Sequence, residues 1–220
     1  GLMDQSAISL GGISFIDFRE PSSPVVEKVK WVFEDVAVVI VNCGGDHCNL
    51  TPEYASIRQE MEQVAKIFSK NTLRDVAEKN FYDNINMLRE KVSGRAILRA
   101  IHFFDENKRV ERMVKEIKEG NKDKVFELIN ESGDSSYKLL QNCYVASDKE
   151  QSIPLALALS KKHPASLARR VHGGGFAGTI LNFVKENNKE DFAQYMGKIF
   201  GKNNVYILDI REDGAVKVEV

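Results

Sequence analysis

The chain lacks the features that mark membrane, secreted and nucleic-acid-binding proteins. No stretch approaches the ~18 uninterrupted apolar residues of a membrane span, and no basic segment precedes an apolar one at the N-terminus. The formal net charge is only -1, whereas binding to a phosphate backbone normally requires a clear basic excess. We therefore expect neither a membrane nor nucleic acid as a partner.

Cysteine is also scarce, with only Cys43, Cys48 and Cys143 in the chain. An odd number at irregular spacing does not fit a secreted disulfide framework and favours a reducing cytoplasm. Cys43 and Cys48 enclose Asp46 and His47, which raises the question of a metal site. Zinc sites usually need a second, closely spaced ligand pair, and none is visible. We therefore predict no metal site and interpret this stretch as a loop that leaves a buried strand.

What the chain does contain is an alternation of strand and helix patterns over 220 residues, 43% of them hydrophobic. Period-two and continuous apolar runs predict strands over 13–19, 35–42, 166–172, 178–184, 204–210 and 214–220, the last two joined by a turn at 212–214. Helical spacing predicts helices over 51–68, 95–120, 121–132, 136–147, 152–162 and 189–201. Thr51 is the expected N-cap of the first of these helices. The pattern indicates an α+β fold with helices inserted between sheet strands.

The sequence RRVHGGGFAGT places three glycines, Gly173 to Gly175, between two predicted strands. Successive backbone N–H groups in such a loop can bind an anion. However, the loop lacks the lysine and hydroxyl of a Walker loop, and a strand follows it instead of a helix. Residue spacing alone therefore favours a tight turn between paired strands.

Three other candidates have ordinary structural explanations. Asp4, in GLMDQ, can simply cap a helix over 5–10. The serine-rich stretch 130–139 resembles a phosphate loop but follows a helix, which favours an interhelical turn with serine caps. His102 lies on an apolar helical face, as a hydrogen-bonded core histidine would.

Four stretches in the order of the chain resemble motifs of the galactokinases, within the superfamily of galacto-, homoserine, mevalonate and phosphomevalonate kinases. GLMDQ resembles the G-x-M-D-Q stretch, and PEYASIR is similar to an E-Y-x-x-R segment at a helix start. RAILRAIHFFDENKRV is similar to a segment in which a histidine precedes E-N-x-R-V, and RVHGGGFAGT resembles the third motif, R-x-x-G-G-G-F-G-G. Together the four stretches are spread along nearly the whole chain.

The resemblance implies a role for each matching residue. Asp4 would be the catalytic base that takes the proton from the anomeric hydroxyl of galactose as this attacks the γ-phosphate of ATP. Gly1 and Tyr54 would lie against the sugar. The loop would line the cleft near the nucleotide and its phosphates through Gly173, Gly174, Gly175, Phe176 and Gly178. His172 and Ala177 depart from the usual motif, in which a small hydroxyl residue and a glycine are common.

The resemblance also implies a fold and a domain organisation. Residues 1–220 would be a C-terminal kinase domain with a ferredoxin-like sheet and an inserted helical bundle, and 1–12 a remnant of the N-terminal catalytic region. The N-terminal phosphate-loop domain, which would supply most contacts to ATP and Mg²⁺, is absent from this sequence. We therefore expect the chain alone to be inactive and to self-associate through an exposed interdomain face.

Two alternatives stay open at this point. One is a related sugar kinase that acts on arabinose, N-acetylgalactosamine or a uronic acid. The other is a non-catalytic sugar sensor or binding module, against which the presence of Asp4 argues weakly.

Overall fold

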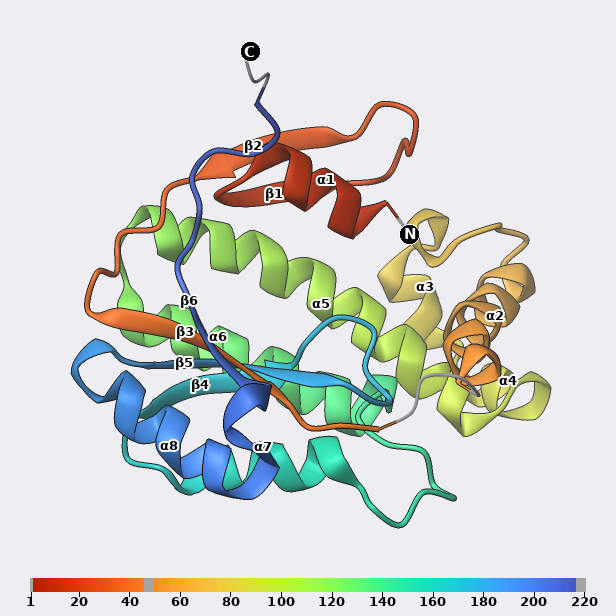
Figure 1. The fold of residues 1–220 in the computed structure, drawn as a ribbon. Coiled ribbons are helices and arrows are strands. Elements are labelled where there is room, and N and C mark those ends of the chain that lie inside the picture. The colour runs from red at the N-terminus through yellow and green to blue at the C-terminus, as the bar shows by residue number, and fades with distance from the viewer. Residues whose placement is uncertain (1, 46–49, 217–220) are drawn as a thin grey trace.

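The computed structural model describes residues 2–45 and 50–216, and an antiparallel sheet of four strands lies at its centre (Figure 1). The strands are β3 (Val36–Asn42), β4 (Ser166–Val171), β5 (Thr179–Lys185) and β6 (Val205–Leu208), in the spatial order β4-β5-β3-β6. If these strands are counted from one to four along the chain, the order is 2-3-1-4, which is the ferredoxin-like order. The predicted α+β fold with a ferredoxin-like sheet is confirmed.

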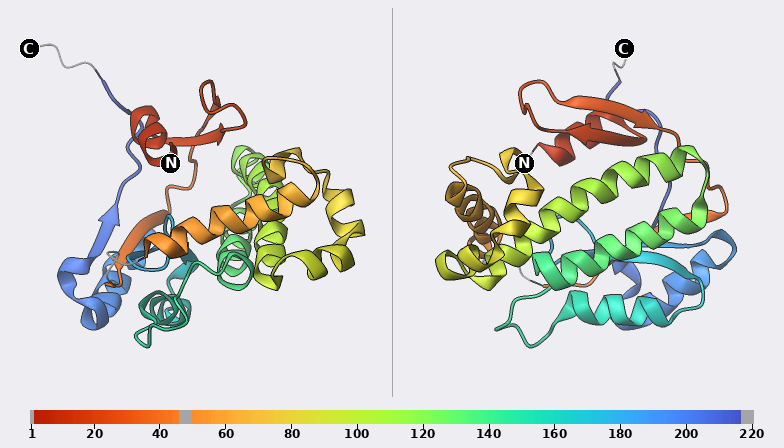
Figure 2. Two further views of the ribbon diagram at one scale, coloured as in Figure 1. Left: turned by 90° about the vertical axis from the view of Figure 1, so that its right-hand side faces the viewer. Right: turned by 180° about the vertical axis from the view of Figure 1, so that it is seen from behind.

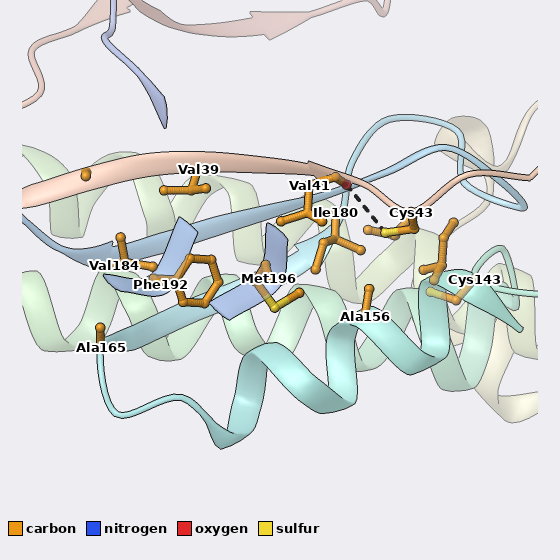
Figure 3. Packing of buried hydrophobic residues seen from close by; sticks show 13 residues of the cluster. Val39, Val41, Cys43, Cys143, Ala156, Ala165, Ile180, Val184, Phe192 and Met196 are labelled. Atoms are coloured by element: carbon orange, nitrogen blue, oxygen red, sulfur yellow. Dashed lines mark hydrogen bonds between the residues drawn. The ribbon is translucent and has the colours of Figure 1, made fainter. Parts of the chain in front are cut away.

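One face of this sheet is covered by α7 (Ser152–Lys162) and α8 (Lys189–Phe200) (Figure 1). Successive side chains of a strand point to opposite faces, so Val39 and Val41 point to this side while their neighbours face the other. The sequence of β3 is apolar at both sets of positions, which suits a strand covered on both faces. Figure 3 shows them packed with Ile180 against Phe192 and Met196 of α8, all fully buried.

The opposite face packs against α6 (Lys122–Ser135) and the C-terminal half of α5 (Gly94–Lys118). Ser93 caps α5 by accepting a hydrogen bond from the Ala96 N–H at 3.1 Å. The N-terminal half of α5 joins a separate helical cluster with α2 (Thr51–Ile67), a 3₁₀ turn (Leu73–Asp75), α3 (Glu78–Asp83) and α4 (Ile85–Lys91). This cluster is the inserted bundle, and its core includes Val64, Phe81, Leu88 and Ile97.

The N-terminal segment stands apart from the main sheet (Figures 1 and 2). It consists of α1 (Met3–Leu10) and an antiparallel hairpin of β1 (Ile13–Asp17) and β2 (Val25–Val29). No side chain of α1 is buried. Short 3₁₀ turns at Glu186–Asn188 and Lys202–Asn204 flank α8. Within the described residues, no helix is long and apolar enough to cross a membrane.

Several sequence predictions differ from the structure. No turn interrupts 130–139, because α6 runs on into a π-helical turn at Ser136–Leu140. The helix expected to reach residue 147 ends there, where Gln141 adopts a left-handed φ of 58°. Thr51 is the first residue of α2 and caps nothing with its side chain. No strand forms over 214–216, the described part of the last predicted strand.

Candidate functional site

The glycine loop, residues 172–178, is the turn between two paired strands, as the sequence predicted. It joins β4 to β5, whose pairing begins where Val171 lies opposite Ile180. Four of its N–H groups hold the loop itself: His172 donates to Thr179 O, Phe176 to Asn142 O, Ala177 to Gly175 O, and Gly178 to Gly44 O. Among the described residues, the N–H groups of Gly173, Gly174 and Gly175 find no acceptor. The loop therefore leaves three successive backbone donors without a partner in the described structure, and such groups are the ones that bind anions in other loops.

Tyr54, in the first turn of α2, packs directly against this loop. Its hydroxyl donates to Gly175 O at 2.7 Å, and its ring meets that of Phe176 edge to face at 5.2 Å between centroids. A Cβ at Gly174 would lie 2.7 Å from Tyr54 Cε1, so the contact requires a glycine there. The structure thus brings together Tyr54 and the loop, two parts of the predicted site that lie more than a hundred residues apart.

Asn142 holds the other side of the loop. Its backbone oxygen accepts from Phe176 N–H, and its side-chain amide donates to Gly174 O at 3.0 Å. A Cβ at Gly175 would lie 2.0 Å from Asn142 O, and the φ of Gly175 is 82°, so no other residue fits that position. Phe176 also has a positive φ, 61°, which costs about 1–3 kcal/mol and persists only because these contacts fix it.

The end of β3 supports the loop from a third direction. Cys43 N–H donates to Gly178 O at 2.7 Å, which continues the pairing of β3 with β5. Burial raises the pKa of the Cys43 thiol to about 12, so at neutral pH it is protonated and not a ready metal ligand. Asp46, His47 and Cys48 lie outside the described residues, as does Gly1, one of the predicted sugar contacts.

Asp4 lies exposed in the first turn of α1, and its carboxylate acts electrostatically on His172 at the start of the glycine loop. Desolvation by the surrounding protein lowers the pKa of His172, the charge of Arg170 lowers it further, and Asp4 opposes both. His172 is therefore neutral at pH 7, and its Nδ1 lies 3.1 Å from Thr179 Oγ1. The predicted base thus has an electrostatic effect on the first residue of the loop that Tyr54 contacts.

The C-terminal segment, residues 209–216, holds α1 in this position. It rises from β6 to the N-terminal segment (Figures 1 and 2), where Gly12 N–H donates to Arg211 O at 2.7 Å and Ala215 N–H to Ser9 O at 3.0 Å. A Cβ at Gly214 would lie 2.0 Å from Ser9 O, so only glycine permits this approach. With no buried side chain of its own, α1 depends on such contacts for its placement.

Sequence reasoning missed Asn142 and Arg99. The Arg99 side chain is only 1% exposed, and it donates to Glu60 and Ser56 of α2 at 2.9 and 3.0 Å and to Leu140 O at 3.1 Å. It therefore ties the helix of Tyr54 to the segment of Asn142. Arg99 lies three residues after Ala96, on the apolar face of the predicted helix, and an arginine on such a face indicates a buried, paired charge. Asn142 gave no such signal, because its partners lie 32 residues or more away.

The serines of 130–139 have a structural role. Ser132 and Ser135 lie on the buried side of α6, where Ser132 donates to Glu106 and Ser135 Oγ lies 2.8 Å from His102 Nδ1. His102 is buried and hydrogen-bonded, as predicted. Neither serine faces the glycine loop as a phosphate ligand would.

Comparison with known proteins gives a consistent set of relatives. No profile of a known protein family matches the chain. The galactokinase of Thermotoga maritima is 28% identical over 222 residues, which cover 99% of this chain and 59% of that protein. The galactokinase of Mannheimia succiniciproducens is 31% identical over 216 residues, and that of Limosilactobacillus reuteri 25% over 204. These cover 97% and 91% of this chain but only 52% and 50% of the relatives.

Solved structures agree on the fold. Lactococcus lactis galactokinase complexed with galactose superposes with a TM-score of 0.79 at 22% identity, covering 99% of this chain and 56% of that one. L. major mevalonate kinase in complex with R-mevalonate gives a TM-score of 0.61 at 13% identity, covering 96% and 53%. The chain thus spans about half the length of the relatives that it matches.

Proposed function

The chain is homologous to galactokinases along 99% of its length, and we propose that it is the C-terminal domain of a cytoplasmic enzyme that phosphorylates galactose with ATP. The enzyme transfers the γ-phosphate to the C1 hydroxyl of the sugar. The observation that carries this proposal is the contact of Tyr54 with a glycine loop in which three successive N–H groups have no acceptor in the described structure.

Each residue has a distinct role in this proposal. Asp4 accepts the proton of the attacking hydroxyl, which requires an ionised carboxylate at the rim of the cleft. Tyr54 lies against the sugar and fixes the loop through Gly175. The N–H groups of Gly173, Gly174 and Gly175 face the transferred phosphate, whose negative charge they stabilise. Phe176 and Gly178, whose own N–H groups are occupied, shape the loop and line the cleft.

A second half of the enzyme completes the site. ATP is held with Mg²⁺, whose charge stabilises the phosphates during transfer. No cluster of three or more acidic, histidine or cysteine side chains suited to a metal occurs in residues 2–45 and 50–216. We therefore assign the Mg²⁺ and most ATP contacts to an N-terminal half with a glycine- and serine-rich phosphate loop. We propose that residues 1–12 are a remnant of the catalytic region of that half; in agreement with this, α1 packs on the hairpin and stands apart from the main sheet.

The test uses the full-length product of the gene that encodes this chain and the 220-residue chain alone. The full-length protein should turn over ATP with galactose faster than with arabinose, N-acetylgalactosamine or a uronic acid, and the chain alone should show no turnover. Preference for another sugar on the panel would reassign the substrate. Sugar binding with no turnover of any sugar would indicate a sensor, and an ordinary kinase rate from the chain alone would refute the domain assignment.

Asp4→Asn in the full-length protein isolates the role of the base. Turnover should fall by about 10²–10⁴-fold, the usual contribution of a positioned base, while galactose affinity changes little. Calorimetry of galactose binding serves as the folding control. Unchanged turnover in a folded variant would exclude Asp4 as the base.

A further inference from the structure

Arg99 is a charged side chain that the protein buries almost completely, and its guanidinium joins two segments of the chain. On one side, Nη1 donates to Ser56 Oγ at 3.0 Å and to Glu60 Oε2 at 2.9 Å, both on α2. On the other side, Nε donates at 3.1 Å to the backbone oxygen of Leu140, where the π-helical turn ends. Since a buried charge is costly unless it is paired and hydrogen-bonded, these contacts fix the two segments relative to each other.

Each of the two segments holds one side of the glycine loop. Tyr54 of α2 donates from its hydroxyl to Gly175 O. Asn142, two residues after Leu140, accepts from Phe176 N–H and donates from its side chain to the loop. The spacing of these two supports, and with it the conformation of the loop, therefore depends on the bridge that the guanidinium forms.

The pairing of Glu60 does not by itself explain this buried arginine. Glu60 has a second partner in Arg95, one turn earlier on α5, whose Nη2 and Nε donate to Glu60 Oε1 at 2.6 and 3.0 Å. Arg95 is 45% exposed, and among the described residues its hydrogen bonds join α5 to α2 only. What Arg99 adds is the bond to Leu140 O, which brings in the segment of Asn142.

We propose that Arg99 is a positioning residue of the kinase site, an inference that rests on the proposed function. Being buried, it contacts neither sugar nor phosphate and acts through Tyr54 and the segment of Asn142. Without the bridge the two supports of the loop move independently. Tyr54 then meets the sugar less closely, and the backbone donors of the loop are no longer held where charge develops on the transferred phosphate.

The test compares Arg99→Lys with wild type in the full-length product of the gene, with circular dichroism as the folding control. Lysine keeps a positive charge against Glu60, but its single ammonium group cannot bond to α2 and to Leu140 O as the planar fork does. We expect the KM for galactose to rise about tenfold and kcat to fall about tenfold or more, while the KM for ATP stays within about twofold. Partial unfolding alone would lower kcat and leave both KM values unchanged.

Two further variants complete the set. Arg95→Gln is the matched control, because it removes bonds to the same carboxylate and leaves the bridge intact, so each constant should change by less than about threefold. Ser56→Ala removes one bond of the bridge and keeps both ion pairs. It should raise the KM for galactose by about threefold and provides the test if Arg99→Lys does not fold.

A second measurement needs no turnover. In the 220-residue chain, the N–H of Phe176 donates to Asn142 O, so its hydrogen exchange, followed by NMR, reports how firmly that segment holds the loop. Exchange at Phe176 should accelerate about tenfold or more in Arg99→Lys and stay within about twofold in Arg95→Gln.

The proposal is overturned if a folded Arg99→Lys enzyme keeps the wild-type KM for galactose, or if Arg95→Gln changes this KM as much as Arg99→Lys does. Unchanged exchange at Phe176 in Arg99→Lys would overturn it as well. A wild-type enzyme that turns over no sugar would refute the proposed function instead, and the exchange at Phe176 would then decide by itself whether Arg99 holds the loop.

Discussion

At the scale of single residues, the contact between Gly174 and Tyr54 decides the shape of the candidate site. In Gly174→Ala the new methyl group would lie 2.7 Å from the Tyr54 ring, so the ring must move and its hydrogen bond to Gly175 O is lost. We expect the free energy of unfolding to fall by about 1–2 kcal/mol, measured by urea denaturation. Gly94→Ala is the control: its Cβ meets nothing, and in a helix it should stabilise by up to about 1 kcal/mol. Equal effects of the two substitutions would contradict this view of the loop.

His102 makes stability depend on pH. Burial lowers its pKa below the usual value of about 6.5, and Arg170 and Arg109 lower it further, although Glu106 opposes them. Below pH 6.5 the unfolded chain therefore takes up a proton that the folded protein resists, and the free energy of unfolding decreases as the pH falls. Urea denaturation between pH 8 and 5 should show this decrease, and His102→Gln should reduce it. An unchanged slope in that variant would assign the pH dependence to other groups.

At the scale of elements, we predict that the C-terminal segment holds α1, and with it Asp4, in place. Gly214→Val places a side chain where Ser9 O lies, so the segment must leave α1, which has no buried side chain to retain it. Hydrogen exchange over 3–12 should accelerate about tenfold or more, while α2 stays protected. Val216→Ala, an exposed position in the same segment, is the control and should change nothing. Equal protection of α1 in both variants would show that other contacts hold it.

The sequence predicted the elements that carry a strong period, and missed those that depend on distant contacts. The strand at β3 and the helices α2, α5, α7 and α8 were found within a few residues, since their apolar patterns match what they bury. β2 was missed because four of its five side chains are not buried and its sequence, VVEKV, pairs only locally with β1. The turn expected at 130–139 was wrong, because the serines there satisfy partners on α5 and β4 instead of capping helix ends.

The candidate site shows the same division. Local patterns identified the glycine loop as a turn between strands, and family resemblance selected Tyr54 and Asp4. The residues that hold these parts together, Asn142 and Arg99, were not predicted. Their roles arise only when α2, the π-helical turn and the loop meet in space: the place of Arg99 on the buried face of α5 marked it as unusual but did not identify its partners, and Asn142 gave no signal at all.

At the scale of the whole molecule, the N-terminal segment exposes apolar surface that the main sheet does not cover. Leu2, Met3 and Ile8 near or on α1, and Val25 and Val26 on β2, are each at least 40% exposed. A two-stranded sheet has unpaired edges and is marginally stable by itself, so a second copy can both pair an edge and cover this surface. In the proposed full-length enzyme, the N-terminal half would occupy the same surface.

We therefore predict that the isolated chain self-associates through this segment. In sedimentation velocity, the average mass should rise above that of a monomer with increasing concentration. Val25→Lys should shift the equilibrium toward monomer by about tenfold or more, because pairing would bury a charge. Leu155→Lys on α7 is the control: Leu155 is 48% exposed, α7 lies on the opposite side of the molecule from β2 (Figure 1), and the substitution should not change association. A chain that stays monomeric at all concentrations, or that responds only to Leu155→Lys, would refute self-association through the N-terminal segment.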